Sequence, residues 1–169
     1  SLQSYLFDDT ALNTDDRDVL HGDLGATLGY RPMPKISSSL RFSFQHNQTI
    51  YIDESKSATN QTQQVYSIVP TFDYKITSKV GFREEGSVIL NATFFDFNDD
   101  QNRLSRTTEL RSTIDARLHR KLGFSLRHGI RFLQDGSYSR GEEDGIRRFG
   151  KSSEDTSRDL SFRAEYTPL

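Results

Sequence analysis

The sequence predicts an all-β fold of about eight antiparallel, up-and-down strands, and three observations support that fold class. Apolar and polar side chains alternate with a period of two residues over most of the chain, as in strands with one apolar face. A short motif recurs forty-four residues apart, as YRPMPKI at 30–36 and YKITSKV at 74–80, and a shorter copy, LHRKLGF, stands at 118–124. Long polar connections alternate with these motifs, so each motif marks the short turn of one hairpin.

The composition argues against several other classes of protein, namely disordered, helical membrane, nucleic-acid-binding and metal-binding proteins. Of the 169 residues, 33% are hydrophobic, and the mean hydropathy is -0.70. These apolar residues are concentrated in periodic segments, unlike those of a disordered chain, and no apolar run is long enough for a membrane-spanning helix. A net charge of -2 without a basic stripe gives no reason to expect nucleic acid as a partner. Because the chain has no cysteine and its four histidines share no metal-ligand spacing, we expect no metal and no cofactor.

The elements follow in order along the chain. The segment SLQSYLFDD at 1–9 alternates weakly, so 1–19 are interpreted as a less certain strand followed by an acidic loop. The clear strands after it carry apolar residues at even positions, within 24–30, 36–44, 66–74, 80–94, 110–118, 122–132 and 160–166. Long loops are expected at about 46–64, 96–103 and 134–159, opposite the short turns. The chain, 1–169, is interpreted as a single β domain or barrel segment.

The odd positions of these strands distinguish a soluble sandwich from a membrane barrel. They are rich in arginine, carboxylates, serine and threonine, whereas the outer face of a soluble sandwich would be rich in lysine. Arginine opposite carboxylates is suited to a wetted, rigid interior. Tyr30, Tyr74 and Tyr166 each precede a short turn on the apolar face, where membrane barrels carry an aromatic girdle.

These features together resemble a known class. The Y-x-x-x-x-K-[IV] turns at Tyr30 and Tyr74, the alternation and the loop asymmetry, over about 20–169, resemble the β-barrel portion of Gram-negative outer-membrane proteins such as porins and TonB-dependent receptors. The resemblance implies an antiparallel up-and-down transmembrane β-barrel in the bacterial outer membrane, in contact with lipid. Eight strands can close on themselves, or they form a segment of a larger barrel. The last motif, YTPL, breaks off at Leu169, which favours the segment.

This interpretation assigns roles to both faces. The residues expected to line a lumen are Arg41, Arg83, Glu85, Glu109, Arg111, Asp115, Arg117, Arg127, Arg131, Arg163 and Glu165. The aromatic residues expected at the lipid interface are Tyr30, Tyr74, Phe82, Phe124, Phe162 and Tyr166. The expected function is a channel or transporter that passes solutes through the Arg-lined lumen, with a mild preference for anions. The alternative is a structural barrel without conduction that holds a protein partner at its loops or in its lumen. We expect no enzyme and no catalytic residue.

A few residues do not suit an apolar face. Glu84 and Arg106 occupy lipid-facing positions, where a mid-bilayer Arg costs roughly 2 to 4 kcal/mol and Glu less. A β-bulge at Gly86 is expected to turn Glu84 aside, and Arg106 is expected to lie beyond the apolar band. His128 shares the face with Ser112, an arrangement that lipid hydrolases use, although a tolerated interfacial histidine is the simpler interpretation.

Overall fold

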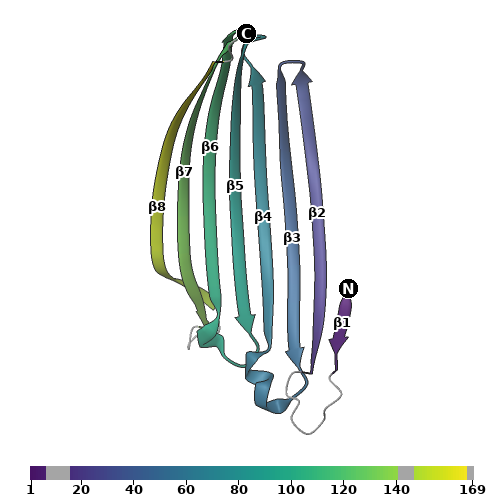
Figure 1. Ribbon diagram of the computed structural model, residues 1–169. Coiled ribbons are helices and arrows are strands. Elements are labelled where there is room, and N and C mark those ends of the chain that lie inside the picture. The colour runs from purple at the N-terminus through teal and green to yellow at the C-terminus, as the bar shows by residue number, and fades with distance from the viewer. Residues whose placement is uncertain (7–15, 141–146, 167–169) are drawn as a thin grey trace.

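The computed structural model of the protein describes residues 1–6, 16–140 and 147–166 and contains one antiparallel sheet. Eight strands lie side by side in chain order, each paired with its neighbours in the sequence (Figure 1). The strands are β1 (Leu2–Tyr5), β2 (Arg17–Met33), β3 (Ile36–Tyr51), β4 (Gln61–Lys75), β5 (Val80–Phe95), β6 (Arg103–His119), β7 (Leu122–Arg140) and β8 (Arg147–Tyr166). The prediction of eight antiparallel, up-and-down strands is therefore confirmed.

The connections at the two ends of the sheet differ, as predicted. Tight turns at 34–35, 76–79 and 120–121 join β2 to β3, β4 to β5 and β6 to β7 at one end. At the other end the connections 52–60 and 96–102 contain the short 3-10 helices η1 (Glu54–Thr59) and η2 (Asp99–Gln101) (Figure 1). The predicted acidic loop at 7–15 and the tip of the last long connection, 141–146, lie outside the described residues.

Two of the predicted loops are too long. Most of 46–64 and of 134–159 belongs to strands, because β3 continues to Tyr51, β7 continues to Arg140 and β8 begins at Arg147. The prediction followed side-chain polarity, but the ladder continues through polar residues such as Asn47 and Gln63, which pair with each other. Backbone groups must find partners whatever side chains they carry, so the polar strand ends remain paired. The predicted loop at 96–103 agrees with the connection at 96–102.

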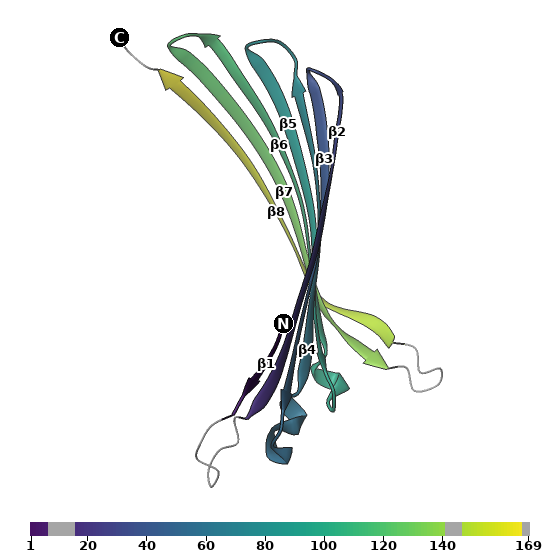
Figure 2. The same ribbon diagram turned by 90° about the vertical axis from the view of Figure 1, so that its right-hand side faces the viewer.

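The sheet does not close into a barrel. Strand order places β1 and β8 at opposite edges, and the 20 residues of β8 cannot be paired along their length by the four residues of β1. Of the two predicted alternatives, a barrel closed by these eight strands alone is therefore not found; the favoured alternative, a segment of a larger barrel, stays a prediction. Seen edge-on, the sheet is one twisted layer (Figure 2). Its accessible surface is 12468 Å² for 19.4 kDa, against roughly 8,500 Å² for a compact monomer of that mass.

The register gives the sheet two chemically distinct faces. From β1 to β8, even-numbered residues pair with even-numbered residues and odd with odd. The exceptions are pairs beside two tight turns and the part of β7–β8 beyond a register shift between Asp135 and Gly136. Because side chains alternate along a strand, this register gathers the predicted apolar set on one face, the even face, and the arginine-rich set on the other, the odd face.

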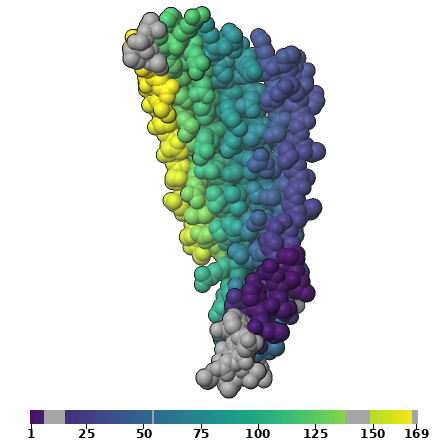
Figure 3. Space-filling model, turned by 45° about the vertical axis from the view of Figure 1, so that its right-hand side comes forward, coloured from purple at the N-terminus to yellow at the C-terminus, as the bar shows by residue number. Residues whose placement is uncertain are grey.

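The even face is uncovered. Among the described residues, only Ala92 and Leu104 are buried hydrophobic residues, whereas Leu28 is 70% and Leu160 is 73% exposed. The space-filling view shows the strands side by side in chain order, with β8 along one edge (Figure 3). Large exposed apolar areas on a protein mark surfaces that contact another molecule or a membrane.

The predicted bulge at Gly86 is absent. The pairing of β5 with β6 runs through Glu84 and Gly86 without a register shift, so Glu84 stays on the even face. Gly86 instead accommodates Pro70 of β4, since a Cβ on Gly86 would lie 3.1 Å from Pro70 Cγ. The absence of a side chain at Gly86 thus leaves room for the Pro70 ring of the neighbouring strand.

Candidate functional site on the charged face of the sheet

The odd face gathers the charged residues that the sequence singled out. All eleven residues predicted to line a lumen lie there, on β3 and on β5 to β8. Asp73 of β4 joins them, opposite Arg83 of β5. The face is continuous across these strands because the register joins residues of the same parity.

Ion pairs on this face run mostly along strands. Among the described residues of this face, the pair from Arg83 to Asp73 is the one that crosses between strands, at 3.8 Å from Nε to Oδ1. This differs from the expected arrangement of arginine facing carboxylates across strand pairs. The others join residues two apart on one strand: Arg83 Nη2 to Glu85 Oε2 at 3.7 Å, Arg111 Nη2 to Glu109 Oε1 at 3.7 Å, and Arg163 Nη2 to Glu165 Oε1 at 2.9 Å.

Several arginines on the odd face have no carboxylate partner. Within the described residues, Arg41, Arg117, Arg127 and Arg131 form no ion pair, and all of them are exposed. Arg131 is opposite Glu109 in the register, but Glu109 pairs with an arginine on its own strand. Uncompensated guanidinium groups on one surface raise the local concentration of anions.

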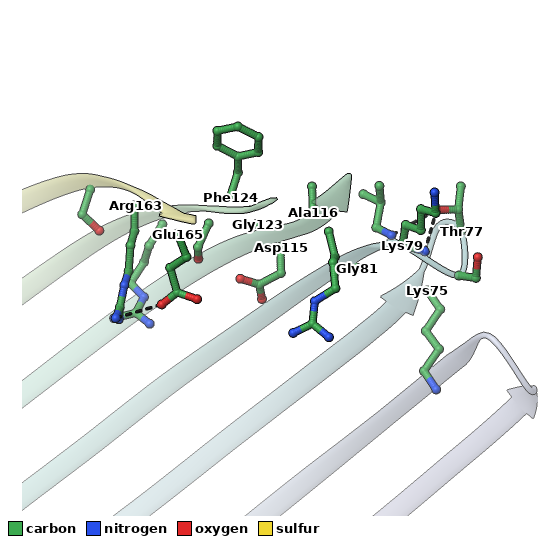
Figure 4. A pocket seen from close by; sticks show the side chains of 16 residues that line it. Lys75, Thr77, Lys79, Gly81, Asp115, Ala116, Gly123, Phe124, Arg163 and Glu165 are labelled. Atoms are coloured by element: carbon green, nitrogen blue, oxygen red, sulfur yellow. Dashed lines mark hydrogen bonds and ion pairs between the residues drawn. The ribbon is translucent and has the colours of Figure 1, made fainter. Parts of the chain in front are cut away.

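A hollow of about 820 Å³ lies on this face near the tight turns. Its charged lining is more basic than acidic and consists of Lys75, Lys79, Arg117, Arg127, Arg163, Asp115 and Glu165. In Figure 4, Asp115, Arg163 and Glu165 point to one side of the sheet and Phe124 points to the other. The hollow indicates that the sheet is concave on its charged face at this end.

The aromatic residues predicted for a lipid interface lie on the even face near the tight turns. Phe124 stacks on Phe162 of the neighbouring strand, with ring centroids 5.8 Å apart. Tyr30 and Tyr166 are 69% and 67% exposed. Tyr74 pairs with Phe82 in the register. These rings therefore form a group along one rim of the apolar surface.

The apolar residues of the even face form a band that crosses the strands obliquely. One row of paired residues is apolar on β2 to β5 and polar on β6 to β8: Leu24, Phe44, Tyr66, Leu90, Arg106, Gln134 and Glu154. A row nearer the tight turns is apolar throughout β3 to β8: Ile36, Tyr74, Phe82, Ile114, Leu126 and Phe162. We call the even-numbered apolar residues of β2 to β8 the apolar band.

The slope of the apolar band is the number of residues by which its end shifts from one strand to the next. On β8 the band ends at Leu160, in the row of Tyr30, whereas on β2 it continues from position 30 to Leu24 and Leu20. Its limit on β8 is six to ten positions from its limit on β2, an average of between one and two residues per strand over six steps. Most of this displacement falls between β6, where Leu104 is in the row of Gly22, and β8. A level band on strands about 4.8 Å apart, tilted by about 40°, would move by about 1.2 residues per strand.

Arg106 interrupts the apolar band on β6, with Leu104 beyond it on the same face; the prediction that Arg106 lies beyond the band is therefore not confirmed. Its Nη2 donates to Gln134 Oε1 on β7. On β8, the Lys151 Nζ contacts Glu154 Oε2 at 2.5 Å, and Glu154 is in the same row as Arg106 and Gln134. These polar side chains of β6 to β8 therefore bind one another.

Glu84, Ser112 and His128 form an interruption within the apolar band, which we call the polar row. Glu84 pairs with Ser112 and Ser112 pairs with His128, on three successive strands. Hydrolysis by a triad requires a histidine between the serine and the carboxylate. Here the serine lies in the middle, and two strand spacings of about 4.8 Å separate the carboxylate from the imidazole. The order of the row does not support a hydrolase.

One polar cluster on the odd face was not predicted. The His21 ring of β2 has its Nδ1 at Asn47 Oδ1 of β3 and its Nε2 at the Asp23 carboxylate. The only signal for it in the sequence is the i, i+2 spacing of His21 and Asp23. The contact with Asn47 depends on the register between β2 and β3, which local sequence does not give.

Two other kinds of site are absent from the described residues. Among the described residues, no helix has the length and hydropathy needed to cross a membrane. No group of histidine and carboxylate side chains in the same ranges is arranged to hold a metal ion. Comparison of the chain with protein-family models, with curated proteins and with solved structures finds no match. The fold and the two faces are thus what any functional assignment must rest on.

Proposed function

We propose that the protein forms part of an outer-membrane channel barrel, with its even face in hydrocarbon and its odd face lining an aqueous passage. The observation that carries the proposal is the oblique apolar band. Its displacement of between one and two residues per strand matches a level hydrocarbon layer crossing strands tilted by 35–45°, as in membrane barrels. A soluble sandwich has no need of such a slope.

The open edges of the sheet have a place in this proposal. The outer edge of β8 presents the backbone groups of a 20-residue strand without a partner strand among the described residues. Unpaired backbone groups are not tolerated in hydrocarbon, so the barrel must be closed by further strands. A barrel wider than eight strands leaves room for water inside.

The charged face supports passage of anions. Arg41, Arg127 and Arg131 lie on it without carboxylate partners among the described residues. Arginine side chains that line a pore favour anions. The hollow near the tight turns, with its surplus of lysine and arginine, would be the mouth of the passage at that rim.

Conductance in planar bilayers, measured on the closed barrel that contains this chain and the strands that complete it, tests the channel. We expect discrete steps and, under a salt gradient, a reversal potential that shows anion preference. Replacing Arg127 and Arg131 by Gln should shift that potential toward the cation side. Arg158→Gln is the matched control, because it removes the same charge from an exposed residue of the even face and should leave the potential unchanged. Absence of steps from the closed, vesicle-inserted barrel would exclude the channel.

A structural barrel that binds a partner is the second candidate. The favouring observation is that Arg83 contacts both Asp73 and Glu85, a small network that stiffens the wall instead of leaving its charges free. Under this alternative the inserted protein is silent in bilayers and the partner occupies the long connections or the lumen.

A further inference from the structure

We infer that the even face carries a site for the phosphate of an anionic phospholipid, at a hollow of about 200 Å³ on β6 and β7. The hollow is lined by Arg106, Thr108, Phe132 and Gln134, and we call it the even-face hollow. The inference rests on the proposed function, because it takes the even face to be in contact with lipid. It adds the kind of lipid headgroup and the place where it binds.

The even-face hollow has a cationic end and an apolar end. Arg106 is opposite Gln134, and one row nearer the tight turns Thr108 is opposite Phe132. The Phe132 side chain is 40% exposed, and Ile130 follows it on the same face of β7. An anionic phospholipid presents its groups in the same order, with a phosphate followed by apolar chains.

Arg106 is positioned to bind an anion. Its Nη2 donates to Gln134 Oε1, which holds the guanidinium at one end of the hollow. The other N–H groups of Arg106 have no partner among the described residues, and a guanidinium can bind two phosphate oxygens at once. The hollow of about 200 Å³ is several times larger than the roughly 30 Å³ of one water molecule, so a headgroup phosphate can enter it.

Arg158 of β8 lies on the other side of Phe132. Phe132 is opposite Thr108 on β6 and Thr156 on β8, so Arg106 and Arg158 are its diagonal neighbours, in opposite directions along the strands. Diagonal neighbours on one face are within reach of long side chains. Arg158 is exposed and forms no ion pair with any described residue. Both guanidinium groups can therefore approach a phosphate that lies over Phe132.

The strand tilt of the proposed barrel brings the two arginines to nearly one depth in the membrane. Arg106 is in the row of Glu154, and Arg158 is four residues nearer the tight turns, so the line joining the arginines moves two residues per strand. A level line across strands tilted by about 40° moves about 1.2 residues per strand in the same direction, which leaves a difference in depth of about 4 Å. One headgroup layer is about 5 to 7 Å thick. Leu104, beyond Arg106, is 7% exposed and presents almost no surface to lipid.

The charge around the even-face hollow favours an anion. Arg106, Arg158 and Lys151 are the cations of this part of the face, and Glu154 is the carboxylate among its described residues, in contact with Lys151 Nζ at 2.5 Å. Basic groups at a membrane surface attract anionic lipids. A soluble anion would leave Phe132 and the neighbouring apolar residues uncovered, whereas the chains of a lipid cover them.

Lipid retention in detergent micelles tests the site, because the site lies within one sheet. The protein is mixed with phosphatidylglycerol or with zwitterionic phosphatidylcholine, taken through detergent exchange and weighed with its bound lipid by native mass spectrometry. We expect preferential retention of phosphatidylglycerol, and Arg106→Gln should lower it by about tenfold because a charge-assisted contact is lost. Arg103→Gln is the matched control, since it removes the same charge from an exposed residue on the odd face of the same strand, and it should retain lipid like the unchanged protein.

The second arginine gives an independent variant. Arg158→Gln should also lower retention of phosphatidylglycerol while the reversal potential of the closed barrel stays unchanged, which separates this site from the aqueous passage. Equal retention of the two lipids, equal losses in the Arg106→Gln and Arg103→Gln proteins, or release of the lipid by excess inorganic phosphate would overturn this inference. Conductance steps without a lipid preference would overturn this inference alone. A silent closed barrel that retains phosphatidylglycerol would overturn the channel and leave the lipid site in place.

Discussion

At the scale of single residues, the ion pairs of the odd face contribute little to folding stability. The Arg83 and Asp73 side chains are 57% and 46% exposed and their atoms are 3.8 Å apart, and exposed pairs of this kind contribute about 0 to 1 kcal/mol. Their effect is instead on the electric field over the sheet. The arginines without ion-pair partners contribute to that field together with neighbouring carboxylates such as Glu109, which is opposite Arg131.

Asp53 carries a pH dependence that can be measured. The Ser55 hydroxyl and then the Ser55 N–H donate to its Oδ1, at 2.5 and 2.8 Å, and hold the pKa of Asp53 below its ordinary value of 3.8. The stabilisation of η1 by this cap is therefore fully present above that value and is lost as the pH falls through the lowered pKa of the folded state. Amide exchange at Ser55 should accelerate in this window. Asp53→Asn keeps the acceptor, so its exchange should lack the transition.

At the scale of elements, the two long connections use the same device. Each contains a short 3-10 helix followed by an asparagine, and the asparagine Oδ1 accepts from the last strand residue: Asn60 from Tyr51 N–H and Asn102 from Phe95 N–H, both at 2.7 Å. Asn60 and Asn102 are 6% and 1% exposed. Each asparagine thus caps the last residue of one strand and directly precedes the first residue of the next.

Removal of this cap should be costly. Asn102→Ala leaves the Phe95 N–H without its acceptor, and we expect a loss of roughly 1–3 kcal/mol in the free energy of unfolding. Asn98→Ala is the matched control, since the Asn98 side chain makes no capping hydrogen bond in the same connection. Urea unfolding in detergent micelles, followed by circular dichroism, would compare the two; equal losses would contradict the assigned role.

The register shift between β7 and β8 depends on a glycine. A Cβ on Gly136 would lie 2.4 Å from the Gly150 carbonyl oxygen, a backbone atom that cannot move without disturbing the pairing. Gly136→Ala should therefore destabilise β7–β8 by about 1–3 kcal/mol and increase amide exchange there. Gly22→Ala meets nothing within 4 Å and should leave exchange unchanged. A stable, unshifted Gly136→Ala protein would contradict this.

The alternation of apolar and polar side chains predicted the strands and the tight turns. It did not predict that the strands continue through their polar ends. The turn motif and alternation depend on side chains within a few residues, so β3 and β5 were identifiable. The strand ends at 46–51 and 134–140 were missed because their pairing depends on a partner strand. Asn60 and Asn102 stand 42 residues apart, close to the turn period. That spacing was the available signal for the caps.

At the scale of the whole molecule, the uncovered even face determines behaviour in solution. Leu24, Leu160 and Phe162 are all more than 60% exposed, and a face of this kind exceeds the apolar patches of monomeric soluble proteins. We expect the protein to associate in detergent-free buffer and to become monodisperse in detergent micelles. Analytical ultracentrifugation in both media would measure this. A stable monomer in plain buffer would contradict the membrane proposal.

Closure was beyond prediction from local pattern. Whether eight strands form a barrel depends on the lengths of the edge strands and on their stagger. The four residues of β1 against the 20 of β8 are a property of the whole sheet. The oblique apolar band likewise becomes visible only when the register aligns Leu24 of β2 with Glu154 of β8 through the strands between them.

The neighbour-only strand order also has a kinetic consequence. Because β2 through β7 each pair only with the strands before and after them in the chain, the growing sheet can zip up hairpin by hairpin, and tight turns such as 34–35 close loops of very few residues. Short loops carry a small entropic barrier. Acquisition of structure should consequently run as a sequence of small steps along the polypeptide, from each hairpin to the next.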